Sequence, residues 1–234
     1  MTAVITDPIA TLLSLVPAVG SARIVVGLVG LPGAGKSTQA KIWANKVNEN
    51  AHANVMQTVG MDGFHYSLAE LAQLPPPKND RSRRGAPWTF DSRKLARKLE
   101  ELHQQKLSGH YMNAYWPDFD HGVGDPVPNA IHIEPSVRLI LVEGLYLLLR
   151  NPEWNLKNLF DHVWFLDENM ETAMRRLVSR HCQSWGMTEA EANARIGVND
   201  KLNAEIVDQT RGYAEALVSP IAIDIDTKKP AGSI

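Results

Sequence analysis

Hydrophobic positions in this chain follow two alternating patterns. Continuous runs rich in Val, Ile and Leu are typical of strands buried on both faces of a sheet. Such runs predict strands at residues 23–30, 54–59, 111–115, 137–142, 161–166 and 220–225. Between them, apolar residues recur with the period of a helix at 36–48, 92–106, 171–181 and from 188 onward. Asp7 as a cap and Pro8 in the first turn predict one more helix near the N-terminus.

This alternation of strands and helices is typical of an α/β fold, in which helices cover both faces of a parallel sheet. The 234 residues are enough for one sizeable domain, so we expect a single domain spanning residues 1–234. The least regular stretch, residues 73–90, is rich in Pro, Arg and Gly. A loop of that length in a compact domain is usually functional or mobile.

The charge balance and the single cysteine narrow the class of protein. There are 24 Lys and Arg against 26 Asp and Glu, with no basic run, which disfavours binding to nucleic acid through bulk positive charge. Cys182 alone cannot form an internal disulfide, which fits a reducing compartment. No apolar run approaches the ~20 residues that a membrane span needs, and the N-terminal segment lacks the basic start of a secretory signal. We therefore expect a cytoplasmic protein with neither a nucleic acid nor a membrane as partner.

The strongest motif is GLPGAGKS at residues 30–37, a full match to G-x-x-x-x-G-K-[ST] between a predicted strand and a predicted helix. Glycines let successive backbone N–H groups point at phosphate oxygens, and the helix N-terminus favours negative charge. In this motif Lys36 reaches the β- and γ-phosphates and Ser37 binds Mg²⁺. We expect a nucleoside triphosphate, by default ATP, bound by Gly30, Pro32, Gly33, Ala34, Gly35, Lys36, Ser37 and Thr38.

The fate of the γ-phosphate depends on other residues. The guanine-reading N-K-x-D motif of GTPases has one near match, at residues 45–48, which lacks the Asp and lies in the first predicted helix. Asp62 follows the second predicted strand, where a carboxylate can accept a proton from a hydroxyl that attacks the γ-phosphate. The alternative is that Asp62 and Gly63 form a simple turn.

A second carboxylate, Glu143, follows the apolar run at residues 139–142 in the manner of a Walker B strand. It could bind Mg²⁺ directly or through water, or it could be a buried carboxylate held by backbone donors. Arg176 and Arg180, four residues apart on one predicted helix, can contact a transferring phosphoryl group together. Arg84, in the irregular loop, is a candidate substrate contact, although a solvated charged face is the alternative for any of these arginines.

Five segments carry a resemblance to a known family. They are GLPGAGKST at 30–38, MDGFH at 61–65, RRGAPWTFD at 83–91, PDFDHGVGDPV at 117–127 and LVEGLYLLL at 141–149. With these segments, residues 24–182 resemble the P-loop kinases of the phosphoribulokinase/uridine kinase family, which includes the bacterial type of pantothenate kinase.

The resemblance implies a three-layer P-loop fold with a five-stranded parallel core sheet and a small helical lid, here at residues 181–200. It implies ATP-dependent phosphorylation of a hydroxyl on a small molecule, with Asp62 as the general base. Arg176 and Arg180 resemble the family's arginines at the base of the lid. The resemblance suggests acceptor contacts from Phe64, His65, Arg84, Asp91 and His121.

Residues 181–200 lack the arginine-glycine lid of uridine kinases and are nearer to less characterised members, some of them called sugar kinases. The acceptor therefore stays open among sugars, nucleosides and pantothenate-like alcohols. Two other functions also stay open. A regulatory ATP-binding protein needs neither Asp62 nor Glu143, and an ATPase acting on a partner needs a residue that positions water, for which the sequence offers no candidate.

Overall fold

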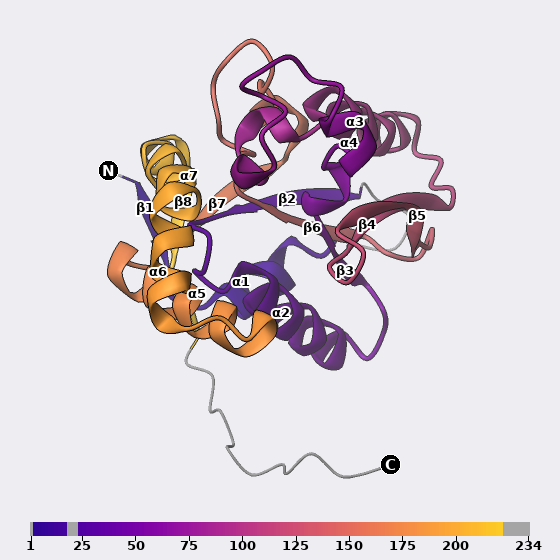
Figure 1. Ribbon diagram of the computed structural model, residues 1–234. Coiled ribbons are helices and arrows are strands. Elements are labelled where there is room, and N and C mark those ends of the chain that lie inside the picture. The colour runs from indigo at the N-terminus through magenta and orange to yellow at the C-terminus, as the bar shows by residue number, and fades with distance from the viewer. Residues whose placement is uncertain (1, 18–22, 222–234) are drawn as a thin grey trace, which may run out of the picture.

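The computed structural model describes residues 2–17 and 23–221, and its centre is a six-stranded parallel sheet (Figure 1). The strands lie in the order β1-β8-β7-β2-β6-β3, with β2 between β6 and β7. Their bounds are β1 (Ala3–Ile5), β2 (Ile24–Val29), β3 (Met56–Gly60), β6 (Leu139–Gly144), β7 (His162–Leu166) and β8 (Ala216–Val218). The predicted α/β class with a parallel sheet is confirmed.

The sheet has six strands where five were expected, and the difference lies at one edge. The additional strand is β1, which lies at the edge and pairs with β8. Because β1 has only three residues, it is too short to show a strand pattern in the sequence. The last strand is β8, whereas the prediction placed it at 220–225. In that range Pro220 and Ile221 are not in a strand, and residues 222–225 lie outside the described residues.

Helices lie on both faces of this sheet. In Figure 1, α1 and α2 lie on one side of it and α4 on the other. The bounds are α1 (Pro8–Leu15), α2 (Lys36–Ala51), α3 (Leu68–Leu71), α4 (Ser92–Ser108), α5 (Met170–Trp185), α6 (Glu189–Val198) and α7 (Asp200–Asp208). Short 3₁₀ turns are η1 (Asp62–Phe64), η2 (Arg81–Arg83), η3 (Pro87–Thr89), η4 (Lys157–Leu159) and η5 (Arg211–Tyr213). None of the helices in the described residues combines the length and apolar character that crossing a bilayer requires.

The helical stretch expected from residue 188 onward is two helices. Thr188 caps α6 with a capping box, and Asn199 then interrupts the helix with φ −134° and ψ −70°. Asn199 is buried, and its amide Nδ2 donates a hydrogen bond to the backbone oxygen of Arg84 (2.8 Å). This interruption turns α7 away from α6 and places Asn199 against the irregular loop.

An antiparallel hairpin, β4 (Ala114–Asp120) and β5 (Asp125–Ile133), lies beside the main sheet. The sequence predicted only a strand at 111–115, because prolines such as Pro117 interrupt the alternation that marks an exposed hairpin. The buried Trp116 donates from Nε1 to the oxygen of Gly60 (2.8 Å). A Cβ atom at Gly63 would lie 2.3 Å from the oxygen of Pro117, so the hairpin packs directly on the turn after β3.

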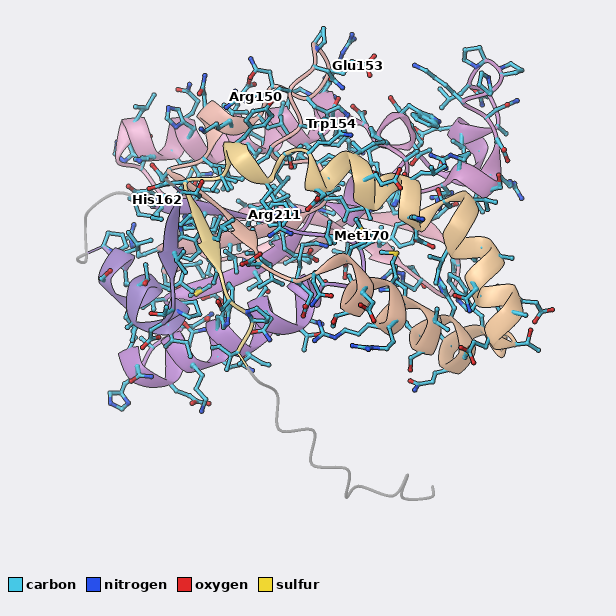
Figure 2. All side chains as sticks on the ribbon, turned by 90° about the vertical axis from the view of Figure 1, so that its left-hand side faces the viewer. Arg150, Glu153, Trp154, His162, Met170 and Arg211 are labelled. Carbon is cyan, nitrogen blue, oxygen red and sulfur yellow. The ribbon has the colours of Figure 1, made fainter. Side chains whose placement is uncertain are left out.

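Arg211, which follows α7, anchors the last described part of the chain to the sheet (Figure 2). Its guanidinium lies 4.6 Å from the ring centroid of Phe165 in β7. It also forms ion pairs with Asp167 and, at 3.1 Å, with Asp208. The contacts join α7 to the carboxyl end of β7, which keeps the α5–α7 segment over the same edge of the sheet as the loops that follow β3 and β6.

A fully buried arginine, Arg23, joins the start of β2 to its neighbours. Its Nε donates to the oxygen of Val137 (3.0 Å), and its Nη2 donates to the oxygen of Glu134 (3.1 Å). Its Nη1 donates to Gln105 in α4 (3.0 Å), and the guanidinium lies 5.4 Å from the ring centroid of Tyr111. Burial lowers the pKa of Arg23, which reflects how little water reaches the group.

Replacing Arg23 by methionine is expected to lower the free energy of unfolding by about 2–4 kcal/mol, because the buried oxygen of Val137 and the partly buried oxygen of Glu134 lose a charged donor. Urea denaturation measures this change. The matched control is Arg97→Met on the exposed face of α4, which should change the stability by less than about 0.5 kcal/mol. Equal losses in the two variants would contradict the stabilising role of Arg23.

Candidate active site

The glycine-rich turn at residues 30–35 connects the central strand β2 to α2. Gly33 and Gly35 have φ of +80° and +92°, a left-handed conformation that side chains other than glycine rarely adopt. A Cβ at Gly33 would lie 2.3 Å from the oxygen of Ala173, so the turn also packs against α5. Lys36, Ser37 and Thr38 form the first turn of α2, where free backbone N–H groups favour a bound anion.

Lys36 is a buried cation at the base of this turn, with 8% of its surface exposed. Its Nζ donates to the oxygens of Gly30 (3.0 Å) and Leu31 (3.1 Å). Burial lowers the pKa of Lys36, and the nearby carboxylates of Glu143 and Asp62 act in the opposite direction. The ammonium group therefore lies within electrostatic reach of both predicted acidic residues.

Ser37 and Glu143 lie together at the end of β6. The hydroxyl of Ser37 donates to Oε1 of Glu143 (2.7 Å). Burial raises the pKa of the Glu143 carboxyl, whereas Lys36 and the hydrogen bond from Ser37 lower it. A hydroxyl and a carboxylate oxygen side by side are the ligand types that Mg²⁺ prefers, and Mg²⁺ usually keeps waters and phosphate oxygens in its other positions. This pair fits a magnesium ion.

Asp62 begins the η1 turn directly after β3. The preceding residue, Met61, donates from its backbone N to the oxygen of Glu143 (2.8 Å), which continues the pairing of β3 with β6. Asp62 therefore lies at the carboxyl edge of the sheet, next to the strand that carries Glu143. Asp62 also lines a cavity.

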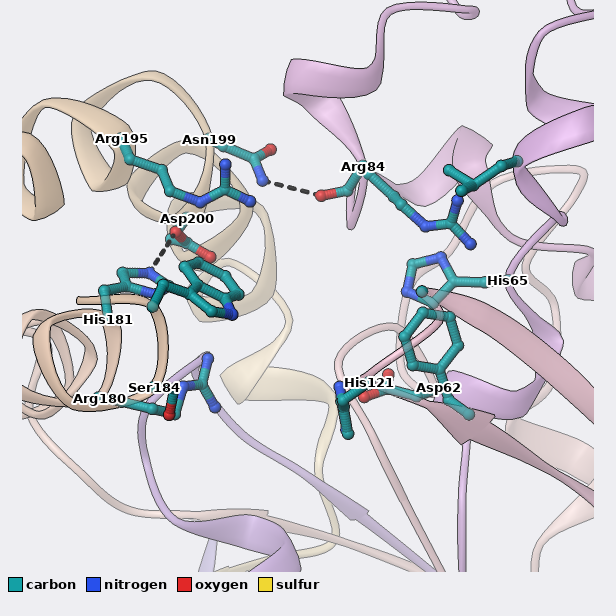
Figure 3. A pocket seen from close by; sticks show the side chains of 14 residues that line it. Asp62, His65, Arg84, His121, Arg180, His181, Ser184, Arg195, Asn199 and Asp200 are labelled. Carbon is teal, nitrogen blue, oxygen red and sulfur yellow. Dashed lines mark hydrogen bonds and ion pairs between the residues drawn. The ribbon is translucent and has the colours of Figure 1, made fainter. Parts of the chain in front are cut away.

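That cavity has a volume of about 560 Å³ and two walls (Figure 3). The first wall comes from η1, the irregular loop and the hairpin, and the second from the α5–α7 segment. The first wall includes Asp62, His65, Leu68, Arg84, Phe119, His121 and Gly124. The second wall includes Arg180, His181, Ser184, Trp185, Arg195, Asn199 and Asp200.

Five of the residues singled out from the sequence thus line one cavity: Asp62, His65, Arg84, His121 and Arg180. They come from four separate segments of the chain, which the fold brings to the same edge of the sheet. Arg180 also lies close enough to Lys36 to lower the pKa of that lysine, so this residue of the second wall is near the glycine-rich turn.

Two expected acceptor contacts lie elsewhere. Phe64 is buried and packs edge-on against Trp116, with ring centroids 5.1 Å apart. Asp91 caps α4 by accepting a hydrogen bond from the backbone N of Lys94 (2.8 Å). Neither residue lines the cavity, because the η1 turn directs Phe64 into the core and the start of α4 engages the carboxylate of Asp91.

Arg176 lies beside the glycine-rich turn and does not line the cavity. Its Nη1 donates to the oxygen of Ala34 (3.2 Å) and forms an ion pair with Glu168 (2.8 Å). A Cβ at Gly35 would lie 4.0 Å from this same nitrogen. The position suits contact with a phosphate chain in the turn better than contact with an acceptor.

Several residues of the second wall were not predicted individually. His181 and Trp185 stack with ring centroids 4.5 Å apart, and the guanidinium of Arg195 lies 4.7 Å from the ring centroid of Trp185. Nε2 of His181 lies 3.3 Å from a carboxylate oxygen of Asp200. The four-residue spacing of His181 and Trp185 places them on one helix face, which is the one signal in the sequence that could have found them.

His65 is half-buried between the rings of Phe90 and Phe119, close to Asp62 in the chain, and lines the cavity. It stacks on Phe90 with ring centroids 3.8 Å apart, and its Nδ1 lies 3.4 Å from the oxygen of Thr89. Burial lowers the pKa of His65 from 6.5 to about 4, so the ring is neutral near pH 7. Because a carbonyl oxygen only accepts, Nδ1 carries the hydrogen, and Nε2 is the acceptor.

The low pKa of His65 predicts a pH-dependent stability. Between pH 6.5 and about 4 the unfolded chain binds a proton that the folded chain excludes, so stability falls as the pH falls through this window. This histidine should lower the free energy of unfolding by about 2 kcal/mol between pH 8 and pH 5, and His65→Phe should abolish that part of the pH dependence. Urea denaturation at both pH values measures the free energy of unfolding. At pH 8 the histidine is neutral in the folded and the unfolded chain, so any difference between variant and parent there comes from altered packing. A variant with the same pH slope as the parent would contradict the prediction.

Comparisons with known proteins give consistent results, although no protein-family model matches the chain. It is 39% identical over 193 residues to a "putative uridine kinase" of Schizosaccharomyces pombe, covering 80% of this chain and 79% of that one. It is 39% identical over 160 residues to an "ATP-dependent kinase-like protein" of Aspergillus versicolor, covering 68% and 92%. A solved "putative fructose transport system kinase" from Silicibacter sp. TM1040 superimposes with a TM-score of 0.76 and 29% identity, covering 90% of this chain and 98% of that one.

Proposed function

Since the chain belongs to the family of ATP-dependent P-loop kinases that includes these relatives, and is therefore a small-molecule kinase, we propose that it phosphorylates a hydroxyl of an acceptor bound beside Asp62. The observation that carries the proposal is the position of this carboxylate. Asp62 lines a cavity of about 560 Å³ and lies within electrostatic reach of the buried Lys36 of the glycine-rich turn.

The donor site in this proposal is built on the turn and the end of β6. The backbone of Gly30, Pro32, Gly33, Ala34, Gly35 and Thr38 surrounds the phosphates of ATP, and Lys36 contacts the β- and γ-phosphates. Ser37 and Glu143 hold Mg²⁺, which when bound offsets charge on the phosphate oxygens. Arg176 contacts the phosphate chain from α5, and Arg180 stabilises the transferring group from the cavity side.

The acceptor site in this proposal is the first wall of the cavity. His65, Arg84 and His121 bind and orient the acceptor, and Asp62 accepts the proton of its reacting hydroxyl. The hydroxyl oxygen forms a bond to the γ-phosphorus while the bond between this phosphorus and the β,γ-bridging oxygen breaks, which releases ADP. The neutral Nε2 of His65 can accept a hydrogen bond from a second hydroxyl of the acceptor.

We also propose that residues 1–234 act as one kinase domain in which residues 181–200 are the lid. The support is that this segment supplies most of the second wall and contacts the first wall at its end. Asn199 donates to the oxygen of Arg84 (2.8 Å), and Arg83 donates to the oxygen of Val198 (2.5 Å). Closing the segment on the irregular loop would exclude water from the reacting phosphoryl group.

The experiment is ADP release by the purified protein with Mg·ATP and a panel of hydroxyl compounds: uridine, cytidine, pantothenate, fructose and ribulose 5-phosphate. Stimulation by an acceptor, together with a phosphorylated product by mass spectrometry, is the expected result. ADP release that no acceptor changes would favour an ATPase. ATP binding without ADP release would favour the regulatory protein.

A further inference from the structure

The cavity beside Asp62 holds more fixed positive charge than the proposed phosphoryl transfer uses. Three arginines line it, Arg84, Arg180 and Arg195, against the carboxylates of Asp62 and Asp200. Asp200 already pairs with His181, and Asp62 is the proposed base. Arg180 lies near Lys36, where the γ-phosphate would be. The proposed transfer therefore gives Arg195 no role and leaves open which part of the acceptor Arg84 binds.

The guanidinium of Arg84 uses only one of its three nitrogens for contacts within the described residues. Its Nη2 donates to the oxygen of Tyr66 (2.8 Å) and lies 3.5 Å from Asp125, whose same oxygen also accepts from the backbone N of Leu68 (2.7 Å). Its Nε and Nη1 are buried and have no hydrogen-bond partner in the part of the chain that the structure describes. Buried donors without an acceptor are costly and rare in native proteins, which points to a partner outside the chain.

Arg195, on the opposite wall, also has an unpartnered donor in the described part of the chain. Its buried Nε has no hydrogen-bond partner among residues 2–17 and 23–221. Its guanidinium is held over Trp185, which in turn stacks on His181, and it forms no ion pair within the part of the chain that the structure describes. Figure 3 shows Arg195 and Arg180 on one wall of the cavity, and Arg84 with His65 and Asp62 on the other.

The two walls also meet close to both arginines. Asn199, four residues after Arg195, donates to the backbone oxygen of Arg84, so the chain segments carrying the two guanidinium groups are directly joined. The two arginines therefore line one cavity from opposite walls whose backbones are joined at this point. Charged donors from two sides are typical of sites for carboxylate and phosphate groups.

We infer that the acceptor carries an anionic group, a carboxylate or a phosphate monoester, besides the hydroxyl that is phosphorylated, and that Arg84 and Arg195 bind this group. The inference rests on the proposed function and narrows its substrate class. The oxygens of a neutral nucleoside or sugar can accept hydrogen bonds from these donors but leave the positive charge of the cavity unbalanced, whereas an anion both accepts the hydrogen bonds and balances the charge.

The test compares compounds that share a skeleton and differ in the anionic group. The probes are glycerol, glycerate and glycerol 3-phosphate, together with pantothenol against pantothenate and fructose against fructose 6-phosphate. Binding is measured by calorimetry with the nucleotide site saturated by Mg²⁺ and a non-hydrolysable ATP analogue. We expect an anionic member to bind about 10- to 100-fold more tightly than its neutral partner. The anion that increases the affinity more, carboxylate or phosphate, identifies which of the two groups the site binds.

Three variants connect this preference to the arginines. Arg195→Met and Arg84→Met should each reduce the preference for the anionic member about 10-fold or more, with ATP affinity unchanged. Arg175→Met on the exposed part of α5, outside the cavity, is the matched control and should keep it. Because Arg84 also supports the oxygen of Tyr66, Arg195→Met decides the outcome if Arg84→Met does not fold.

ADP release from the same compounds separates the two proposals. If neutral members are bound and phosphorylated as well as anionic ones, or if no anionic member binds better than its neutral partner, the anion inference is overturned. If anionic members bind through Arg195 and Arg84 but never stimulate ADP release, the anion site stands and the transfer beside Asp62 is overturned.

Discussion

Replacing Asp62 by asparagine is expected to lower kcat for the stimulating acceptor by about 10²- to 10⁴-fold, the usual contribution of a general base. Asparagine keeps the size and the hydrogen-bonding capacity of the side chain but cannot take the proton of the hydroxyl. The affinity for ATP should change less than about twofold, because no hydrogen bond joins Asp62 to the glycine-rich turn among the described residues. Steady-state ADP release and nucleotide titration measure the two quantities.

Asp91→Asn is the matched control for this prediction. Asp91 lies in a segment with the same family resemblance, but its carboxylate caps α4 outside the cavity. Asparagine is as good an N-cap as aspartate, so the control should retain its stability and its turnover. If Asp62→Asn lost ATP affinity and turnover to the same extent, the carboxylate would be a structural part of the donor site and not the base.

The second large effect is expected from Lys36→Met, which should lower kcat/KM for ATP by about 10²- to 10³-fold, the usual effect of removing one preorganised donor. Lys36 is within electrostatic reach of both Glu143 and Asp62, and in its proposed role its charge offsets the charge on the transferring phosphoryl group. Methionine fills much the same volume, so the main loss is electrostatic. ADP release at varied ATP concentration gives the ratio.

Lys46→Met, on the exposed face of the same helix, controls for the loss of a positive charge from α2. A melting curve of each variant shows whether the turn stays folded when the oxygens of Gly30 and Leu31 lose their shared donor. A folded Lys36→Met enzyme with the parent's kcat/KM would exclude Lys36 from the donor site.

The parts of the site that the sequence predicts are those set by local geometry. A buried strand followed by Gly33, Gly35 and Lys36 has few backbone solutions, because the positive φ values require glycine and the helix follows directly. The same holds for Asp62, two residues after β3, and for Glu143, the last residue but one of the adjacent parallel strand β6. Parallel strands end at one edge of a sheet, so position in the sequence was enough to bring these residues together.

The parts that the sequence does not predict depend on tertiary contacts. Phe64 and His65 are neighbours in the chain, yet η1 directs the first into the core against Trp116 and leaves the second on the cavity. The hairpin is hidden because Pro117, Pro126 and Pro128 interrupt the alternation of its strands and most of β5 is exposed. Arg195 lines the cavity on a helix that ends at Asn199, the residue that attaches this segment to the loop of Arg84.

One residue of β6 has a wider consequence for how the enzyme keeps its two substrates aligned. Glu143 accepts the hydroxyl of Ser37 with its side chain, and with its backbone oxygen it accepts the N–H of Met61, the residue before Asp62. On the proposed roles, the spacing between donor and acceptor is therefore set inside a rigid sheet and is independent of how the lid moves. The outer walls can then change in evolution to admit a different acceptor, while the line of attack on the phosphorus is inherited unchanged.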